Sequence, residues 1–497
     1  MSVQSLDGEH ATGLTDLLSI GFGTTVAMWA VGYVGHMPLA DAPPLVFVSL
    51  MLVCLAAGGW IVGKKTPRGL PGGLGLGLIV ALLNLLILGS VRSMLAEPNS
   101  GQMVPQAWLW LSGYFVICLA LATGGAAAGT VLRSKSDRSV RAGATARRDA
   151  PPRPLAGEES GVREPDWLLV FAWTACLATL LLISVGGLVT GFRAGMAVPD
   201  WPNTYGSNMF LYPLAKMTGG VFYEHAHRLL GSLVGLTTLV LAILLSFDGR
   251  SIPALILVWT VGLCVGLQGV MGGFRVTDAT PAIRDTLAVA HGFFAHVILA
   301  GMVGVAMLLR YSSRSAVKDI TAERDEYSSN ARSPGETDAF LATLLVLAIL
   351  GQTLLGTLVR QMDIGLIVHL SVAMLVAVLA ILVGVRLWGL YPHIAVVARG
   401  GVALLGVVAL QIILGGISLA CRTPPAAASP SAEQLQTQAE ILQPAAHALL
   451  TTAHQTTAAV LLGIAALLAF SAWRFAVMQG SLTPTETPRA RTETATL

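Results

Sequence analysis

Long, nearly uncharged apolar runs recur along the whole sequence, and they constrain the fold more than any other feature. A run of about 20 apolar residues is long enough to cross a bilayer as an α-helix. The chain is 54% hydrophobic and only 11% charged, and its mean hydropathy is +0.71, which is not the composition of an ordinary water-soluble domain. The sequence therefore predicts an all-α integral membrane protein. Nothing in it indicates nucleic-acid binding.

The apolar runs predict about twelve transmembrane helices, arranged as four, a linker and then eight. The expected spans are 14–35, 44–63, 73–95, 107–132, 166–190, 222–246, 252–272, 286–310, 339–359, 363–385, 401–420 and 445–471. A stretch rich in Arg, Pro, Ala and Gly follows the fourth span, as is typical of a solvated hinge. The predicted segments are an N-terminal four-helix membrane domain 1–132, a basic linker 133–165, a first four-helix bundle 166–310, a loop 311–338, a second four-helix bundle 339–471 and a tail 472–497.

The basic loops predict the orientation of these helices. Segments rich in Lys and Arg follow the second, fourth and eighth spans, and all three fall on one side of the membrane if the count of spans is right. Short loops rich in Lys and Arg are typically cytoplasmic. The linker, the basic loops and both termini are therefore expected in the cytoplasm.

The last eight predicted helices contain a repeat of four helices. In the first unit GGLVTGFR precedes EHAHRLL, and LQGVMGGFRV precedes LAVAHGFF; in the second unit LGTLVRQ precedes GLIVHLS, and LQIILGGISLACR precedes LTTAHQTT. One His thus recurs near the start of the second and fourth helix of each unit: His227 and His291, then His369 and His454. These helices can face one another across a bundle, so each unit is expected to pair two imidazoles near the outer face.

Paired imidazoles of this kind are suited to a haem. Neutral imidazole is a good axial ligand for haem iron, and the apolar porphyrin suits the core of a bundle. Its propionates need positive partners, and arginines lie at the outer helix ends against the usual inside preference of positive charge. The candidates are Arg193, Arg228, Arg275, Arg360 and Arg422. Two haems are therefore expected, one in each unit.

The histidines allow other interpretations. A lone membrane His is often a hydrogen-bonded packing residue, but fourfold recurrence on one side disfavours this role. A structural zinc site needs four close N or S ligands, whereas these His fall in two bundles. Three further His lie outside the repeat and are expected at interfaces or beside the sites: His225, His296 and His447. The others are expected in loops or on the surface, with His36 a weaker candidate ligand: His10, His36 and His393.

The segment YEHAHRLL places a carboxylate beside the first His pair. Glu224 and His227 are spaced i, i+3 and share one helix face, and Arg228 follows Glu224 by four residues. The second unit has Leu366 where the first has Glu224. Glu224 can form an ion pair with Arg228, take part in proton transfer, or stabilise positive charge at a reacting carbon. These roles are compatible with one another.

In this order, the motifs GGLVTGFRAGMAVPDWP, EHAHR, LQGVMGGFRV with AVAH, HLSVA and AHQTT resemble the haem A synthase family over residues 166–471. The resemblance implies an enzyme of the bacterial inner membrane that oxidises a ring methyl group of haem O to a formyl group by successive hydroxylations. The product, haem A, serves terminal oxidases. It further implies that His227 and His291 hold the substrate haem O, that His369 and His454 hold a permanent haem b, and that Glu224 is catalytic.

Two departures from the family and two competing functions accompany this resemblance. Many members carry a cysteine pair that includes the first outer loop, whereas PDWPNTYG has none and Cys421 has no partner in its own loop. The extra domain 1–132 is the other departure, and haem O synthase or a terminal oxidase subunit is a candidate partner for it within the lipid bilayer.

A di-haem b electron-transfer protein and a haem-handling transporter or chaperone are the alternative functions. The sequence does not identify an electron donor.

Overall fold

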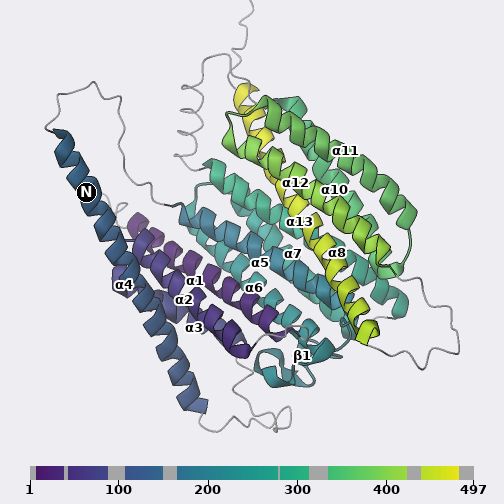
Figure 1. Cartoon of the computed structure of the whole chain (residues 1–497), viewed down its shortest axis with the longest axis horizontal. Helices are drawn as coiled ribbons and strands as arrows, with labels where there is room; N and C mark the ends of the chain where they lie inside the picture. Colours follow the sequence, from purple (N-terminus) through teal and green to yellow (C-terminus); the bar gives the residue numbers. More distant parts are fainter. Residues whose placement is uncertain are drawn as a thin grey trace, which may run out of the picture.

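The computed structural model describes residues 7–37, 43–87, 107–148, 165–277, 280–312, 334–422 and 438–480. This part of the chain is almost entirely helical, with one two-stranded hairpin (Figure 1). Twelve of its helices are long and apolar enough to cross a membrane. The prediction of an all-α, multi-pass membrane protein with twelve spans is therefore confirmed.

Four helices make up the N-terminal domain: α1 (Asp7–His36), α2 (Pro44–Lys65), α3 (Gly69–Asn84) and α4 (Ala107–Arg148). Helices α2 and α4 cross closely, because a Cβ atom on Gly63 would lie 2.0 Å from the carbonyl oxygen of Ala126. Small residues allow this approach, which supplies packing contacts between helices in lipid. Helix α4 continues to Arg148, so the first half of the predicted linker is helical; 149–164 lie outside the described residues.

The remaining eight long helices follow in chain order as two groups of four (Figure 1). The first unit contains α5 (Trp167–Gly191), α6 (Gly219–Asp248), α7 (Ile252–Thr277) and α8 (Pro281–Ser312). The second contains α10 (Glu336–Met362), α11 (Leu366–Leu390), α12 (Ala395–Ala420) and α13 (Gln438–Gly480). The tail predicted from 472 is thus helical to 480, and 481–497 lie outside the described residues.

Contacts between the units place both bundles and the N-terminal domain side by side. Helices α5 and α8 pack against α13, and α8 also packs against α10. Helix α1 packs along α5, where the Ser19 hydroxyl donates to the Trp167 carbonyl at 2.6 Å. The Tyr33 ring of α1 stacks on Phe222 of α6 with centroids 5.1 Å apart. The first bundle therefore lies between the N-terminal domain and the second bundle (Figure 1).

The predicted outer loop, residues 192–218, joins α5 to α6 and contains a short hairpin of β1 (Asn203–Thr204) and β2 (Ser207–Asn208). Tyr205 and Gly206 form its two-residue turn with φ values of 49° and 73°, as hairpin turns of this length require. Two 3₁₀ turns follow: η3 (Met209–Leu211) and η4 (Leu214–Lys216). The hairpin lies beside the start of α6, where the first predicted His ligand is located.

Candidate functional site

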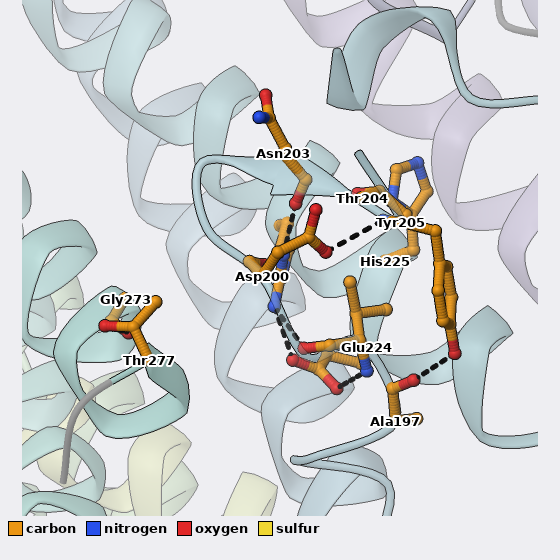
Figure 2. A network of polar contacts seen from close by, with 11 residues as sticks. Ala197, Asp200, Asn203, Thr204, Tyr205, Glu224, His225, Gly273 and Thr277 are labelled. Atoms are coloured by element: carbon orange, nitrogen blue, oxygen red, sulfur yellow. Dashed lines mark hydrogen bonds and ion pairs between the residues drawn. The ribbon is translucent and has the colours of Figure 1, made fainter. Parts of the chain in front are cut away.

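Glu224 and Arg228, one turn apart on α6, fasten the outer loop to that helix. Arg228 donates to the carbonyl oxygens of Asp200 at 2.6 Å and Asn203 at 3.0 Å. It donates as well to the Val198 carbonyl at 3.1 Å and to Glu224 Oε1 at 2.7 Å. The Val198 N–H donates to Glu224 Oε2 at 2.8 Å (Figure 2). The ion pair allowed by the i, i+4 spacing is present, and both oxygens of the buried Glu224 carboxylate have donors.

Asp200 stabilises the same loop by hydrogen bonds to other residues of the loop. Its carboxylate accepts from the N–H of Tyr205 at 2.8 Å and from that of Gly206 at 2.7 Å. The Tyr205 hydroxyl in turn donates to the Ala197 carbonyl at 2.5 Å (Figure 2). The Asp of the PDWP motif thus stabilises the turn whose backbone Arg228 binds.

The loop also reaches across to α7. Trp201 packs against Gly273 so closely that a Cβ atom there would lie 2.4 Å from the indole. A Cβ atom on Gly195 would lie 3.0 Å from an Nη atom of Arg275. The loop therefore covers the N-terminal end of α6 and the C-terminal end of α7, next to the helix positions of the first His pair.

The structure brings the first predicted His pair together. His227 of α6 and His291 of α8 face each other with ring centroids 6.2 Å apart and ring planes 65° apart. The Nδ1 atom of each ring is buried and has no hydrogen-bond partner among the described residues. A metal bound to imidazole nitrogen lies about 2.0–2.1 Å from it, so two rings at this separation leave space for one metal centre between them.

The second predicted pair occupies the same places on α11 and α13, but glutamines contact its rings. The Gln352 amide nitrogen lies 2.9 Å from His369 Nδ1 and donates to the His369 carbonyl at 2.9 Å. The Gln411 amide nitrogen lies 3.3 Å from His454 Nε2. Within the described chain no ring contact like that of the first pair joins His369 to His454.

A glycine on the preceding helix lies against each of the four imidazoles. A Cβ atom would lie 3.0 Å from His227 Cε1 if added to Gly186, and 3.2 Å from His291 Cε1 if added to Gly272. The corresponding pairs in the second unit are Gly356 with His369 at 3.1 Å and Gly415 with His454 at 3.0 Å. These glycines repeat in the sequence as regularly as the His, so the repeat could have identified them, although we did not predict them.

Three of the five candidate arginines have protein partners. Arg228 belongs to the loop contacts described above, and Arg422 forms an ion pair with Asp363. Arg360 donates to the Gly187 carbonyl at 2.7 Å, to the Thr452 hydroxyl at 3.2 Å and to Gln455. Arg360 therefore bridges α10 to α5 and α13, a role that its position at a helix end did not predict.

The other two candidate arginines have no hydrogen-bond partner for their side chains in the described ranges. Arg193 is exposed and has a φ of 53°. Arg275 is half-buried beside the loop, and its Nε atom is buried without a partner. A buried guanidinium nitrogen without an acceptor is costly, so Arg275 is the arginine best placed to receive an anionic group of a ligand.

Two of the three His outside the repeat have ring contacts with the protein. His225 is buried, and its Nδ1 atom lies 3.0 Å from the Thr204 hydroxyl of the hairpin. His296 is buried on α8, with Nδ1 2.8 Å from the Gly292 carbonyl. His447 is half-buried near the start of α13, and its Nδ1 atom is buried with no hydrogen-bond partner among the described residues. No group of three or more His, Cys, Asp or Glu in the described part of the chain could hold a bare metal ion.

Part of the chain matches a known protein family. Residues 169–370 match the model of the COX15-CtaA family, described as cytochrome oxidase assembly proteins. The matched region contains Glu224, His227, His291 and His369. No curated protein and no solved structure gave a match. The region 169–370 is thus similar to the COX15-CtaA family of cytochrome oxidase assembly proteins, and the four N-terminal helices and the helices after residue 370 lie outside the match.

Proposed function

We propose that this protein is a haem A synthase of the bacterial inner membrane. In this reaction a ring methyl group of the substrate haem O is hydroxylated twice, and the hydrated aldehyde loses water to become a formyl group. The single observation that carries the proposal is the facing pair His227 and His291, with the Glu224 carboxylate one turn from His227. The match to a family of cytochrome oxidase assembly proteins supports it, since the product serves terminal oxidases.

The residues of the first unit fit a haem. The Nδ1 atoms of His227 and His291 have no hydrogen-bond partner among the described residues, and glycines rather than larger side chains pack against the two rings. The partly buried, unpartnered Arg275 suits a propionate. We assign His227 and His291 as ligands of the substrate haem, and Arg275 with the exposed Arg193 as its anion partners.

Glu224 acts in this proposal as a fixed negative charge beside the substrate. An ionised carboxylate only accepts hydrogen bonds, and Glu224 receives one from Val198 and one from Arg228. Such preorganised charge stabilises positive charge that develops during a reaction. The same contacts keep the loop closed over the outer end of the bundle and limit water at the reacting carbon.

The second unit holds the permanent cofactor in this proposal. His369 and His454 would be the ligands of a haem b, which supplies one-electron transfer when bound. The side-chain amides of Gln352 and Gln411 lie beside the two imidazoles. Leu366 replaces Glu224 in this unit, so the second site has the ligands without the carboxylate. Among the outer arginines, Arg422 is paired with Asp363 and Arg360 with protein acceptors.

We also propose that both termini lie in the cytoplasm and that the His pairs lie toward the outer face. The basic segments after the second, fourth and eighth spans support this orientation. The N-terminal domain packs on α5 and α6 of the substrate unit. Its proposed partner is haem O synthase or a terminal oxidase subunit, and deletion of 1–132 without loss of haem A in cells would contradict that role.

The activity is tested in a bacterium that makes haem O but lacks its own haem A synthase. The wild-type chain and the Glu224→Gln and Glu224→Ala variants are expressed, and extracted haems are identified by chromatography and mass. Asp248→Asn, at the other end of α6, is the matched control. Wild type and control should yield haem A, whereas the Glu224 variants should accumulate haem O or a hydroxylated intermediate.

A different outcome would favour the electron-transfer alternative. If the wild-type chain is stable, is loaded with haem and has a working electron donor, yet yields only haems B and O, the proposed oxidation is wrong. A di-haem b carrier does not need Glu224, so unchanged redox behaviour in Glu224→Gln would then support that function.

A further inference from the structure

Helix α1 of the N-terminal domain reaches the first turns of α6, where the substrate site begins. It packs against both α5 and α6 (Figure 1). Near the end of α1, the Tyr33 ring stacks on Phe222 with ring centroids 5.1 Å apart and ring planes 29° apart. Phe222 closely precedes Glu224 and His227 on α6. The N-terminal domain therefore contacts the part of α6 that carries the proposed catalytic carboxylate.

The Tyr33 ring continues into further aromatic contacts at the site. Phe222 contacts Tyr223 edge to face with centroids 5.4 Å apart, and Tyr223 stacks on Phe192 at 4.4 Å. Phe192 is the first residue after α5, at the start of the outer loop. Tyr33, Phe222 and Tyr223 are buried. These rings join α1 to the beginning of α6 and to the beginning of the loop.

Polar contacts fix α1 within the N-terminal domain. Trp29 Nε1 donates to Asn84 Oδ1 of α3 at 2.7 Å, and both side chains are buried. Arg68, which precedes α3, donates to the buried Asp16 carboxylate at 3.0 Å. Trp29 lies four residues before Tyr33 and therefore on the same side of α1. Helix α1 is thus held by its own domain on the side from which Tyr33 contacts α6.

Stacked and edge-to-face aromatic pairs stabilise a contact beyond the burial of their area. We propose that Tyr33 is a positioning residue of the substrate site, which holds the first turns of α6 through Phe222 and Tyr223 and so keeps Glu224 against the outer loop. This inference rests on the proposed function. The Tyr33 hydroxyl is buried without a hydrogen-bond partner in the described ranges, so the ring makes the contact. The N-terminal domain then acts on the site from within the chain.

Hydrogen–deuterium exchange tests this contact without relying on activity. The full chain is purified with its haems from the haem-O-producing host, and mass spectrometry follows the Val198 amide, which donates to Glu224. Tyr33→Ala removes the ring, and Tyr33→Phe keeps it. Tyr33→Leu keeps apolar bulk without the flat ring, for the case in which Tyr33→Ala does not fold. Phe22→Ala is the matched control, because Phe22 of α1 packs edge-on against Phe171 near the start of α5, with centroids 5.2 Å apart.

Tyr33→Ala should speed exchange at the Val198 amide by about tenfold. Haems extracted from the same cells should shift from haem A toward haem O or a hydroxylated intermediate, because Glu224 is no longer held in place. Tyr33→Phe should behave as the wild type. Phe22→Ala should keep the wild-type exchange rate at this amide, although the lost core ring lowers its thermal stability.

Equal exchange rates in Tyr33→Ala and wild type would overturn the inference. Equal acceleration in Phe22→Ala would also overturn it, since the effect would then be general destabilisation. The same loss in Tyr33→Phe as in Tyr33→Ala would assign the effect to the hydroxyl and contradict the role of the ring. If the wild type yields no haem A while Tyr33→Ala still exchanges faster, the proposed function fails and the positioning contact stands.

Discussion

At the scale of single residues, two adjacent glycines on α12 have different surroundings. A Cβ atom on Gly415 would lie 3.0 Å from the His454 ring, whereas one on Gly416 would meet nothing within 4 Å. Gly415→Ala should displace the ring and reduce haem retention in the second site by roughly tenfold. Haem content after purification measures the effect, and Gly416→Ala should retain wild-type content. Equal loss in both variants would show that contact with the ring is not the cause.

Arg228 is the residue on which the closed outer loop most depends. Arg228→Lys keeps the charge but loses the planar guanidinium that binds several carbonyl oxygens together. Each lost hydrogen bond costs about 1 kcal/mol, so the Val198 and Tyr205 amides should exchange hydrogen at least about tenfold faster. Hydrogen–deuterium exchange in detergent, followed by mass spectrometry, measures these exchange rates. Arg250→Lys, just beyond the far end of α6, should leave the loop unchanged.

At the scale of helices, close crossings of small residues hold the N-terminal domain together. Gly63→Ala would place a Cβ atom 2.0 Å from the Ala126 carbonyl oxygen, whereas Gly124→Ala on α4 meets nothing within 4 Å. Overpacking of this kind costs about 1–3 kcal/mol. Thermal unfolding in detergent should therefore show a lower unfolding midpoint for Gly63→Ala than for the wild type. Gly124→Ala should keep the wild-type midpoint.

For the whole molecule, Arg360 is the main polar link between the two bundles. Its guanidinium joins α10 to Gly187 of α5 and to Thr452 and Gln455 of α13. Arg360→Leu should destabilise the pair of bundles by about 3 kcal/mol, since buried acceptors lose charged donors. Thr456→Val removes only the bond to Ser184 at 3.0 Å and should cost about 1 kcal/mol. An equal loss in both variants, measured by thermal unfolding, would contradict this role.

The sequence predicted correctly the features that follow from the pattern of neighbouring residues, namely the helices and the repeated His. Apolar length located all twelve spans, because lipid requires each backbone to satisfy its own hydrogen bonds as a helix. The fourfold repeat located His227 and His291, which the structure pairs. It did not predict the partners of Arg360 and Arg422, since a guanidinium at a helix end can bind either a ligand or a protein acceptor that lies distant in sequence.

The sequence by itself determined the class, the number of helices, the tandem repeat and the four candidate ligands, because helix length and periodicity are properties of neighbouring residues. Only the tertiary structure decided which groups meet: the loop carbonyls on Arg228, the amides on three of the four His and the bridge from Arg360 to α5. These contacts join residues on different helices. Their geometry is set by how the helices pack, which no local pattern specifies.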